Sequence, residues 1–211
     1  MPYSKLHNFI FVHIPKCAGK SICRAFEEAN IELEFKGRAP LLYKEEYCIK
    51  EMWLNHLSAH AIKCLLSSND FETFFKFSIV RNPWDLLVSY YFYHKKEYER
   101  SPQFRLDWPG IAQRFDSSPT FDAWLHSGIY VQPQLSFLTD ESGVLLVDFI
   151  GRFESLQEDF HHICSTLKLK LKLPHLNSTD HKPYRIYYNN VTRKLVETTF
   201  EKDISTFNYN F

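Results

Sequence analysis

Apolar and polar positions alternate along the chain in a pattern that predicts short buried strands followed by amphipathic helices. The run Phe9–Val12 is apolar throughout, which is typical of a short strand buried in a parallel sheet. A polar turn follows, and apolar residues then recur at the spacing of one helical face, at Ile22, Ala25, Phe26 and Ala29. We therefore expect a strand, a sharp turn and a helix at the start of the chain.

Two later stretches repeat this order. Phe74–Val80 and Val144–Ile150 are apolar runs of strand length. Asn82 and Pro83 after the first run favour the N-cap and the first position of a helix, and Ser155–Glu158 after the second run has the spacing of a capping box. Alternating strands and helices predict an α/β fold with three layers, in which a central, mainly parallel sheet has helices on both faces.

The remaining segments are less regular. Ser58 is expected to cap a short helix that turns Leu65 and its apolar neighbours inward, and Leu41–Met52 is interpreted as a weakly patterned helix. Glu97–Pro119 is polar and rich in proline signals, so we interpret it as a long binding loop or lid, and Val191–Phe207 as a final helix. The 211 residues are expected to form a single domain, 1–211.

The composition narrows the classes of function. The 25 basic and 25 acidic residues cancel, which argues against a protein that binds nucleic acid through a basic excess. The five cysteines are odd in number and widely spaced, so we expect neither a disulfide framework nor a metal site. No apolar run approaches the roughly 20 residues of a membrane span, and no signal sequence precedes the first strand, so we expect no membrane span and a cytoplasmic protein.

The turn between the first strand and the first helix is the clearest candidate for chemistry. It reads His13-Ile-Pro-Lys-Cys-Ala-Gly-Lys-Ser21, and we call this segment the anion loop. Gly19 lets the backbone approach a ligand without a Cβ atom in the way. The N–H groups at the helix start, the helix dipole, the ammonium groups of Lys16 and Lys20 and the Ser21 hydroxyl together favour a bound phosphate.

One known type of phosphate loop fits this segment in part. Gly19-Lys20-Ser21 matches the second half of the P-loop of kinases and NTPases, but the first glycine of that motif would stand at position 14, which is Ile14. Asp148, in an apolar run, has the place of the aspartate that holds Mg²⁺ in such enzymes. A kinase or NTPase that uses Mg-ATP through Lys20, Ser21 and Asp148 is therefore one alternative, and a non-catalytic nucleotide-binding protein is another.

A second type of loop fits better. The anion loop resembles, at seven of nine positions, the phosphosulfate loop H-I-P-K-T-A-G-T-S of sulfotransferases that use 3′-phosphoadenosine 5′-phosphosulfate; Cys17 and Lys20 replace its two threonines. Arg81-Asn-Pro, with Ser89 eight residues after the arginine, resembles the element that holds the 3′-phosphate in that family. Ile150-Gly-Arg-Phe-Glu154 and His181-Lys-Pro-Tyr-Arg185 are similar to the C-terminal half of small bacterial-type members of the family, which are related to the carbohydrate (heparan/chondroitin-type) sulfotransferases. The likeness covers nearly the whole chain.

This resemblance implies a P-loop-like enzyme that moves a sulfuryl group from the donor to an acceptor hydroxyl without a metal ion. The 5′-phosphosulfate of the donor is then expected to contact Lys16, Cys17, Ala18, Gly19, Lys20, Ser21 and Ile22. Lys16 is the expected catalytic cation, which neutralises charge on the leaving oxygen. Arg81 and Ser89 are expected to bind the 3′-phosphate, with Arg185 as a further candidate.

The acceptor hydroxyl needs a general base, for which histidine is the obvious residue type. Asn55-His-Leu-Ser resembles the stretch in which the heparan-type enzymes carry their catalytic histidine, which favours His56 over His60. The resemblance points to a carbohydrate acceptor, and lipid, polyketide and phenolic acceptors stay open. Nothing in the sequence indicates the oligomeric state.

Overall fold

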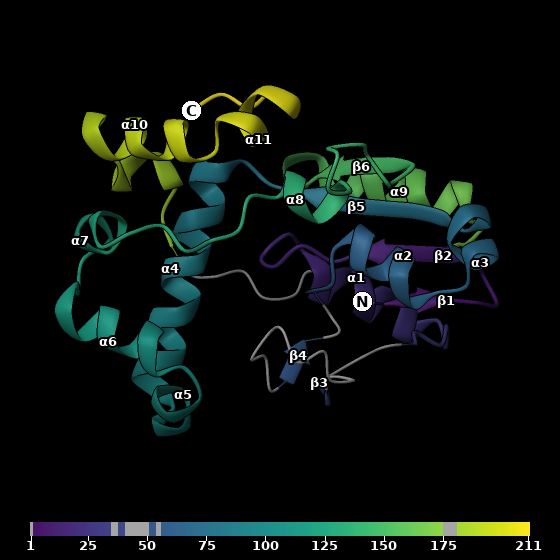
Figure 1. Cartoon of the computed structure of the whole chain (residues 1–211), viewed down its shortest axis with the longest axis horizontal. Coiled ribbons are helices and arrows are strands. Elements are labelled where there is room, and N and C mark those ends of the chain that lie inside the picture. Colours follow the sequence, from purple (N-terminus) through teal and green to yellow (C-terminus); the bar gives the residue numbers. More distant parts are fainter. Residues whose placement is uncertain (1, 35–37, 41–50, 54–55, 175–180) are drawn as a thin grey trace. The chain divides into compact units, whose positions relative to one another are not determined.

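The computed structural model describes residues 2–34, 38–40, 51–53, 56–174 and 181–211. These residues fall into two compact units, each built from two stretches of chain (Figure 1). Unit 1 combines Met1–Val80 with Gln134–Asn177, and unit 2 combines Arg81–Pro133 with Ser178–Phe211. Most of the predicted helix Leu41–Met52 lies outside the described residues. Of the described helices, none is long and apolar enough to cross a membrane.

Unit 1 contains the sheet. In the described residues it has four strands in the order β1-β2-β5-β6, with bounds Tyr3–Ser4, Phe9–Val12, Phe75–Val80 and Phe149–Arg152. Strands β2, β5 and β6 are parallel, and β1 pairs with β2 in the antiparallel direction at the edge. The predicted mainly parallel sheet is therefore confirmed. A separate antiparallel pair is formed by β3 (Arg38–Pro40) and β4 (Glu51–Trp53).

The third parallel strand begins later than the apolar pattern predicts. Val144 and Leu145 are 58% and 47% exposed, and strand β6 starts only at Phe149. The Asp140 carboxylate accepts hydrogen bonds from the backbone N–H groups of Ser142 and Val144, so a local turn takes up these residues. An apolar run alone does not show where pairing begins.

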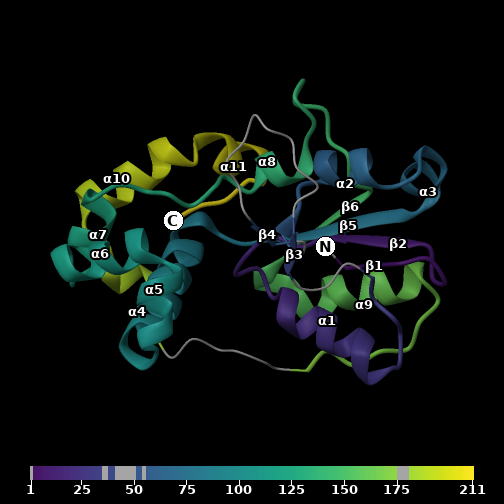
Figure 2. The same ribbon diagram turned by 60° about the horizontal axis from the view of Figure 1, so that its bottom comes forward.

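Helices cover both faces of the sheet, as predicted. Figure 2 shows α1 (Gly19–Glu28) and α9 (Leu156–Thr166) along one face, and α2 (Ala59–Leu65) and α3 (Ser68–Thr73) along the other. On the first face, the Phe26 ring of α1 stacks on Phe9 at 4.6 Å between centroids and meets Phe160 of α9 edge-on at 6.3 Å. A fifth helix, α8 (Leu135–Leu138), packs against α2.

The predicted helix starts are right in part. Ser58 caps α2 by accepting a hydrogen bond from Ala61 N at 3.2 Å, but Leu65 is exposed rather than inward. The capping box predicted at Ser155 is wrong, because the Ser155 side chain makes no cap hydrogen bond. Its hydroxyl donates instead to Asp159 Oδ2 at 2.7 Å, and the same oxygen accepts from Arg152 N, so Asp159 joins the strand end to the helix.

Unit 2 is helical in its described residues. Its core includes Trp84 and Tyr91 from the first long helix, α4, and Trp124 and Phe200 from later in the chain. The elements are α4 (Pro83–Arg100), α5 (Pro102–Asp107), α6 (Pro109–Ser117), α7 (Phe121–His126), the 3₁₀ turn η3 (Tyr184–Tyr187), α10 (Asn190–Thr199) and α11 (Glu201–Thr206). The predicted final helix is thus two helices that meet at Phe200.

The interpretation of Glu97–Pro119 as a loop or lid is wrong. Helix α4 continues to Arg100, and α5 and α6 fill most of the remainder. Pro102 and Pro109 occupy the first turns of these helices, where a missing N–H costs nothing. Ser101 caps α5 by accepting from Phe104 N at 3.3 Å. The same prolines that indicate a break in the sequence are helix starts in the structure.

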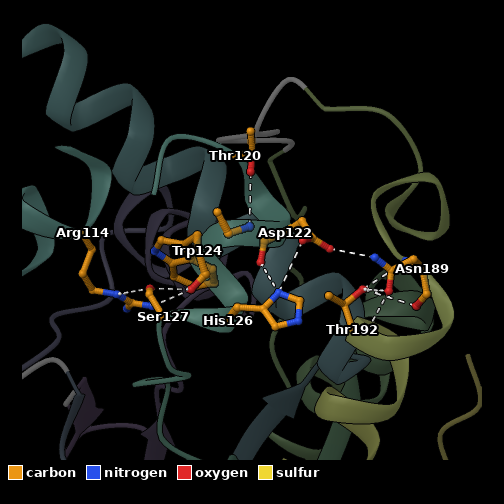
Figure 3. A network of polar contacts seen from close by, with 9 residues as sticks. Arg114, Thr120, Asp122, Trp124, His126, Ser127, Asn189 and Thr192 are labelled. Atoms are coloured by element: carbon orange, nitrogen blue, oxygen red, sulfur yellow. Dashed lines mark hydrogen bonds and ion pairs between the residues drawn. The ribbon is translucent and has the colours of Figure 1, made fainter. Parts of the chain in front are cut away.

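A polar network fixes α7 at both ends (Figure 3). The Arg114 guanidinium donates to the Trp124 carbonyl oxygen at 2.8 Å and also to the Gly128 carbonyl, so it satisfies the carboxyl end of the helix. At the amino end, Asn189 Nδ2 donates to Asp122 Oδ1 at 2.8 Å. Asn189 is also the N-cap of α10, so the network joins α6, α7 and α10.

Candidate functional site

The anion loop adopts a strained backbone conformation. It leaves the carboxyl end of β2 at Val12 and enters α1 at Gly19. Lys16 and Ala18 have φ angles of 64° and 60°, in the left-handed region that costs a non-glycine residue about 1–2 kcal/mol. Strained residues persist where the surroundings hold them, and they cluster at binding sites. The conformation therefore marks this loop as a candidate site.

The start of the loop is tied to the sheet. Ser78 on β5 is fully buried, and its hydroxyl donates to the Val12 carbonyl oxygen at 2.7 Å. His13 follows directly and is 9% exposed. Burial keeps the pKa of the His13 imidazole well below its ordinary value, and the nearby His56 and Lys20 act in the same direction. The His13 ring is therefore neutral at pH 7.

Gly19 has a different role from the one that its sequence position indicates. The sequence predicts that Gly19 leaves room for a ligand, but the imidazole of His13 lies against Gly19. A Cβ atom built on Gly19 would come within 1.7 Å of His13 Nε2. Gly19 is thus required by the packing of His13 on the first residue of α1.

We predict that Gly19→Ala destabilises the protein by about 1–3 kcal/mol, the usual cost of overpacking, and lowers its melting temperature. Alanine is a better helix former than glycine, so only the clash with His13 can make this substitution destabilising. The control is Gly110→Ala in α6, where an added Cβ meets nothing within 4 Å and should be neutral or stabilising. An equally stable Gly19→Ala protein in thermal unfolding would contradict this packing.

Cys17, one of the two departures from the phosphosulfate loop, points into the protein. Its side chain is 1% exposed, and Sγ donates to Gln134 Oε1 at 3.5 Å. The Cys17 side chain is therefore directed to Gln134 and away from solvent. Ile22 is fully buried as well, so only the backbone of these two residues can contact a bound anion.

The remaining loop residues are arranged for an anion. Lys16 is half-buried, Lys20 is exposed, and Ser21 is 6% exposed in the first turn of α1. The N-cap Ala18 makes no side-chain cap hydrogen bond to the first turn. A helix amino end without a side-chain cap, beside two lysines, is a favourable place for a negatively charged group.

His56 is held next to this loop in a defined orientation. Its Nδ1 lies 3.0 Å from the His13 carbonyl oxygen, which only accepts hydrogen bonds, so Nδ1 carries the proton. The two imidazole rings are 4.4 Å apart between centroids. Burial lowers the pKa of His56, and the hydrogen bond to His13 partly opposes that effect. A neutral His56 protonated on Nδ1 has a basic Nε2, as a general base requires.

His60, the alternative base, has different surroundings. It lies in the first turn of α2, and its side chain is 41% exposed. Its Nε2 is 3.8 Å from Glu141 Oε1 and 3.9 Å from Cys64 Sγ. The structure places His56, rather than His60, against the anion loop.

The second predicted element lies in unit 2. Arg81 directly follows β5, is 6% exposed, and donates from Nε to Asp85 Oδ2 at 2.8 Å. Asn82 caps α4 through Trp84 N at 3.1 Å, which confirms the predicted helix start. Ser89 is 1% exposed and lies one helical turn beyond Asp85 on the same face of α4. Asp85 thus orients the guanidinium at the start of the helix that carries Ser89.

Arg185 lies in a turn that packs on the same helix. It is exposed in η3, which packs on α4, and its guanidinium is 5.5 Å from the ring centroid of Tyr184. The Tyr184 hydroxyl in turn accepts a hydrogen bond from Asn82 Nδ2 at 3.4 Å. Within unit 2 the fold therefore brings the turn that carries Arg185 to Asn82, the residue after Arg81.

The proposed magnesium ligand of the kinase alternative is misplaced. Asp148 precedes β6 and forms an ion pair with Lys76 at 3.0 Å, and Lys76 N also donates to it at 2.7 Å. It therefore lies at the amino end of β6, about 13 Å along the strand from the carboxyl end at Arg152. The anion loop follows the carboxyl end of a parallel strand, so Asp148 is a structural partner of Lys76.

Two residues of the site escape the sequence analysis. Gln134 stands before a short apolar run and belongs to no motif, so only its complete burial in the structure reveals it. His13 is part of the anion loop, but the sequence gives no sign that its ring contacts both Gly19 and His56.

Comparison with known proteins identifies the family of the chain. The model of the Sulfotransferase family matches residues 2–210. No curated protein and no solved structure matches the chain. Because the family match covers essentially the whole sequence, the chain belongs to the sulfotransferase family.

Proposed function

We propose that this sulfotransferase takes its sulfuryl group from 3′-phosphoadenosine 5′-phosphosulfate and transfers it to a hydroxyl group of a carbohydrate. The anion loop carries this proposal: its strained backbone, its helix amino end and its two lysines suit the doubly charged 5′-phosphosulfate. The carbohydrate acceptor rests on the resemblance to the heparan and chondroitin enzymes, with a lipid, polyketide or small phenolic acceptor as the alternative.

In the proposed reaction the acceptor oxygen forms a bond to sulfur while the bond from sulfur to the bridging phosphate oxygen breaks. The electron pair of that bond stays on the phosphate oxygen and gives adenosine 3′,5′-bisphosphate. Lys16 neutralises the charge that grows on this oxygen, and N–H groups of the first turn of α1 hold the phosphate. His56 Nε2 takes the proton of the acceptor hydroxyl.

We further propose that Arg81 and Ser89 bind the 3′-phosphate, and that Arg185 adds charge at the same end of the donor. The ion pair with Asp85 supports this role, because it holds the Arg81 guanidinium in one orientation before the ligand arrives. The kinase alternative is not supported, since Asp148 is paired with Lys76 at the amino end of its strand.

We predict that Arg81→Ala weakens the binding of adenosine 3′,5′-bisphosphate about 10- to 100-fold, the loss expected for a hydrogen bond to a charged group. The rate at saturating donor should change much less, because the 3′-phosphate that Arg81 is proposed to bind takes no part in the bond that breaks. Calorimetric titration measures the affinity. The matched control is Arg100→Ala at the exposed end of the same helix.

Arg81→Lys distinguishes charge from geometry, and thermal unfolding of each variant shows whether loss of the Asp85 ion pair affects folding. Unchanged affinity in a folded Arg81→Ala protein, or an equal loss in Arg100→Ala, would overturn the assignment of the 3′-phosphate.

A further inference from the structure

A buried glutamine contacts the anion loop from a distant part of the chain. Gln134 is fully buried, and its Oε1 accepts the hydrogen bond from Cys17 Sγ across 117 positions of sequence. Glutamine is mostly exposed in folded proteins, and burying its amide is unfavourable unless hydrogen bonds compensate. The burial of a glutamine in contact with the anion loop therefore needs a structural or functional explanation.

The contact falls between the two strained residues of the loop. Cys17 lies between Lys16 and Ala18, the two loop residues with left-handed backbone angles. Such a conformation persists only where neighbouring structure fixes it. The side chain of Cys17 is 1% exposed, so the loop is anchored from inside the protein at the residue between its two strained positions.

The segment that carries Gln134 is itself well supported. Gln134 precedes α8, and α8 packs on α2, the helix whose cap Ser58 is two residues after His56. Phe137 and Leu138 of α8 are buried. Gln134 therefore connects the anion loop to the part of unit 1 that also supports His56.

We propose that Gln134 is a positioning residue of the anion loop: its amide holds Cys17 and so keeps Lys16 and the first turn of α1 in the conformation that binds the donor. The part of this inference that concerns the donor rests on the proposed function. The part that concerns the loop conformation does not.

The test uses Gln134→Leu, which keeps a buried side chain of similar volume but removes the hydrogen-bond acceptor. The exposed Gln157→Leu on α9 is the control. The first readout is alkylation of the Cys17 thiol by iodoacetamide, followed by peptide mapping, which needs no ligand. We expect Cys17 to react at least about tenfold faster in Gln134→Leu than in the wild type, because the loop opens more often.

The second readout is the affinity for adenosine 3′,5′-bisphosphate. We expect Gln134→Leu to weaken it about tenfold, as for one buried hydrogen bond. Cys17→Ala removes the other partner, so the double variant should lose no more than the larger single loss. Fully additive losses would show that the two residues act separately and would overturn the proposal.

The two parts of the account separate in this experiment. Unchanged alkylation in Gln134→Leu contradicts the positioning role. If Cys17 reacts faster in Gln134→Leu but the wild-type protein binds no bisphosphate, the positioning role stands and the donor assignment is refuted.

Discussion

Lys16→Ala is expected to lower kcat about 10²- to 10³-fold, the loss typical when one preorganised charge stabiliser is removed from an active site. Lys16 is at the turn of the anion loop, and its backbone is held in the left-handed conformation. Its ammonium group is proposed to act on the oxygen that becomes charged only as the bond to sulfur breaks. The rate should therefore fall far more than the affinity for adenosine 3′,5′-bisphosphate.

Steady-state kinetics with saturating donor, beside calorimetric titration of the bisphosphate, measure the two effects. Lys5→Ala, in an exposed turn of the same unit, controls for the loss of a positive charge. Arg81→Ala is expected to give the opposite pattern, with affinity lost and the rate largely kept. If both variants lose rate and affinity to the same extent, the proposed division of roles between the two residues fails.

His56→Ala is expected to slow transfer about 10²- to 10⁴-fold and to leave binding of the bisphosphate unchanged, because a general base acts only in the chemical step. The hydrogen bond from Nδ1 to the His13 carbonyl leaves Nε2 as the basic atom. His161→Ala, on the exposed side of α9, is the matched control. Full activity in His56→Ala would contradict the assignment and move the role to His60 or to another residue.

The pH dependence gives an independent check on His56. Burial lowers its pKa below the ordinary value of about 6.5, so the side chain stays neutral at pH 7 and takes up a proton only as the pH falls further. Transfer by the wild type should therefore decline in acid, at a pH below 6.5, and the residual activity of His56→Ala should lack this decline. The same shift means that the unfolded chain binds protons more readily. The contribution of His56 to stability is therefore present above about pH 6.5 and is lost as the pH falls from there through the lower pKa of the folded state.

The strand, turn and helix around the anion loop could be predicted, because each sequence pattern there is compatible with only one kind of secondary structure. Phe9–Val12 is apolar throughout and is buried throughout, and Asn82 caps α4 as its position before a proline predicts. Elsewhere one signal fits two structures. Proline at Pro102 and Pro109 indicates either a loop or a helix start, and only the packing of α5 and α6 decides between them.

The candidate site too could be predicted only in part. Its charged residues can be predicted from motifs, but the residues that position them cannot, because those contacts cross long stretches of sequence. Gln134 reaches Cys17, and the ring of His13 occupies the space beside Gly19. In the kinase alternative, the apolar neighbours of Asp148 favour a metal ligand, whereas its partner in the structure is Lys76 in the adjacent strand. Strand register, which the sequence pattern does not specify, decides this case.

The most direct test of the central claim is a calorimetric comparison of adenosine 3′,5′-bisphosphate with Mg-ATP as ligands of the wild-type protein. The bisphosphate carries the 3′-phosphate proposed for Arg81 and Ser89 and the 5′-phosphate proposed for the anion loop. We predict that it binds tightly without a metal ion and that Mg-ATP binds far more weakly. Tight binding of Mg-ATP with no binding of the bisphosphate would contradict the donor assignment. Lys20 and Ser21 would then be assigned the roles of the corresponding P-loop residues in kinases.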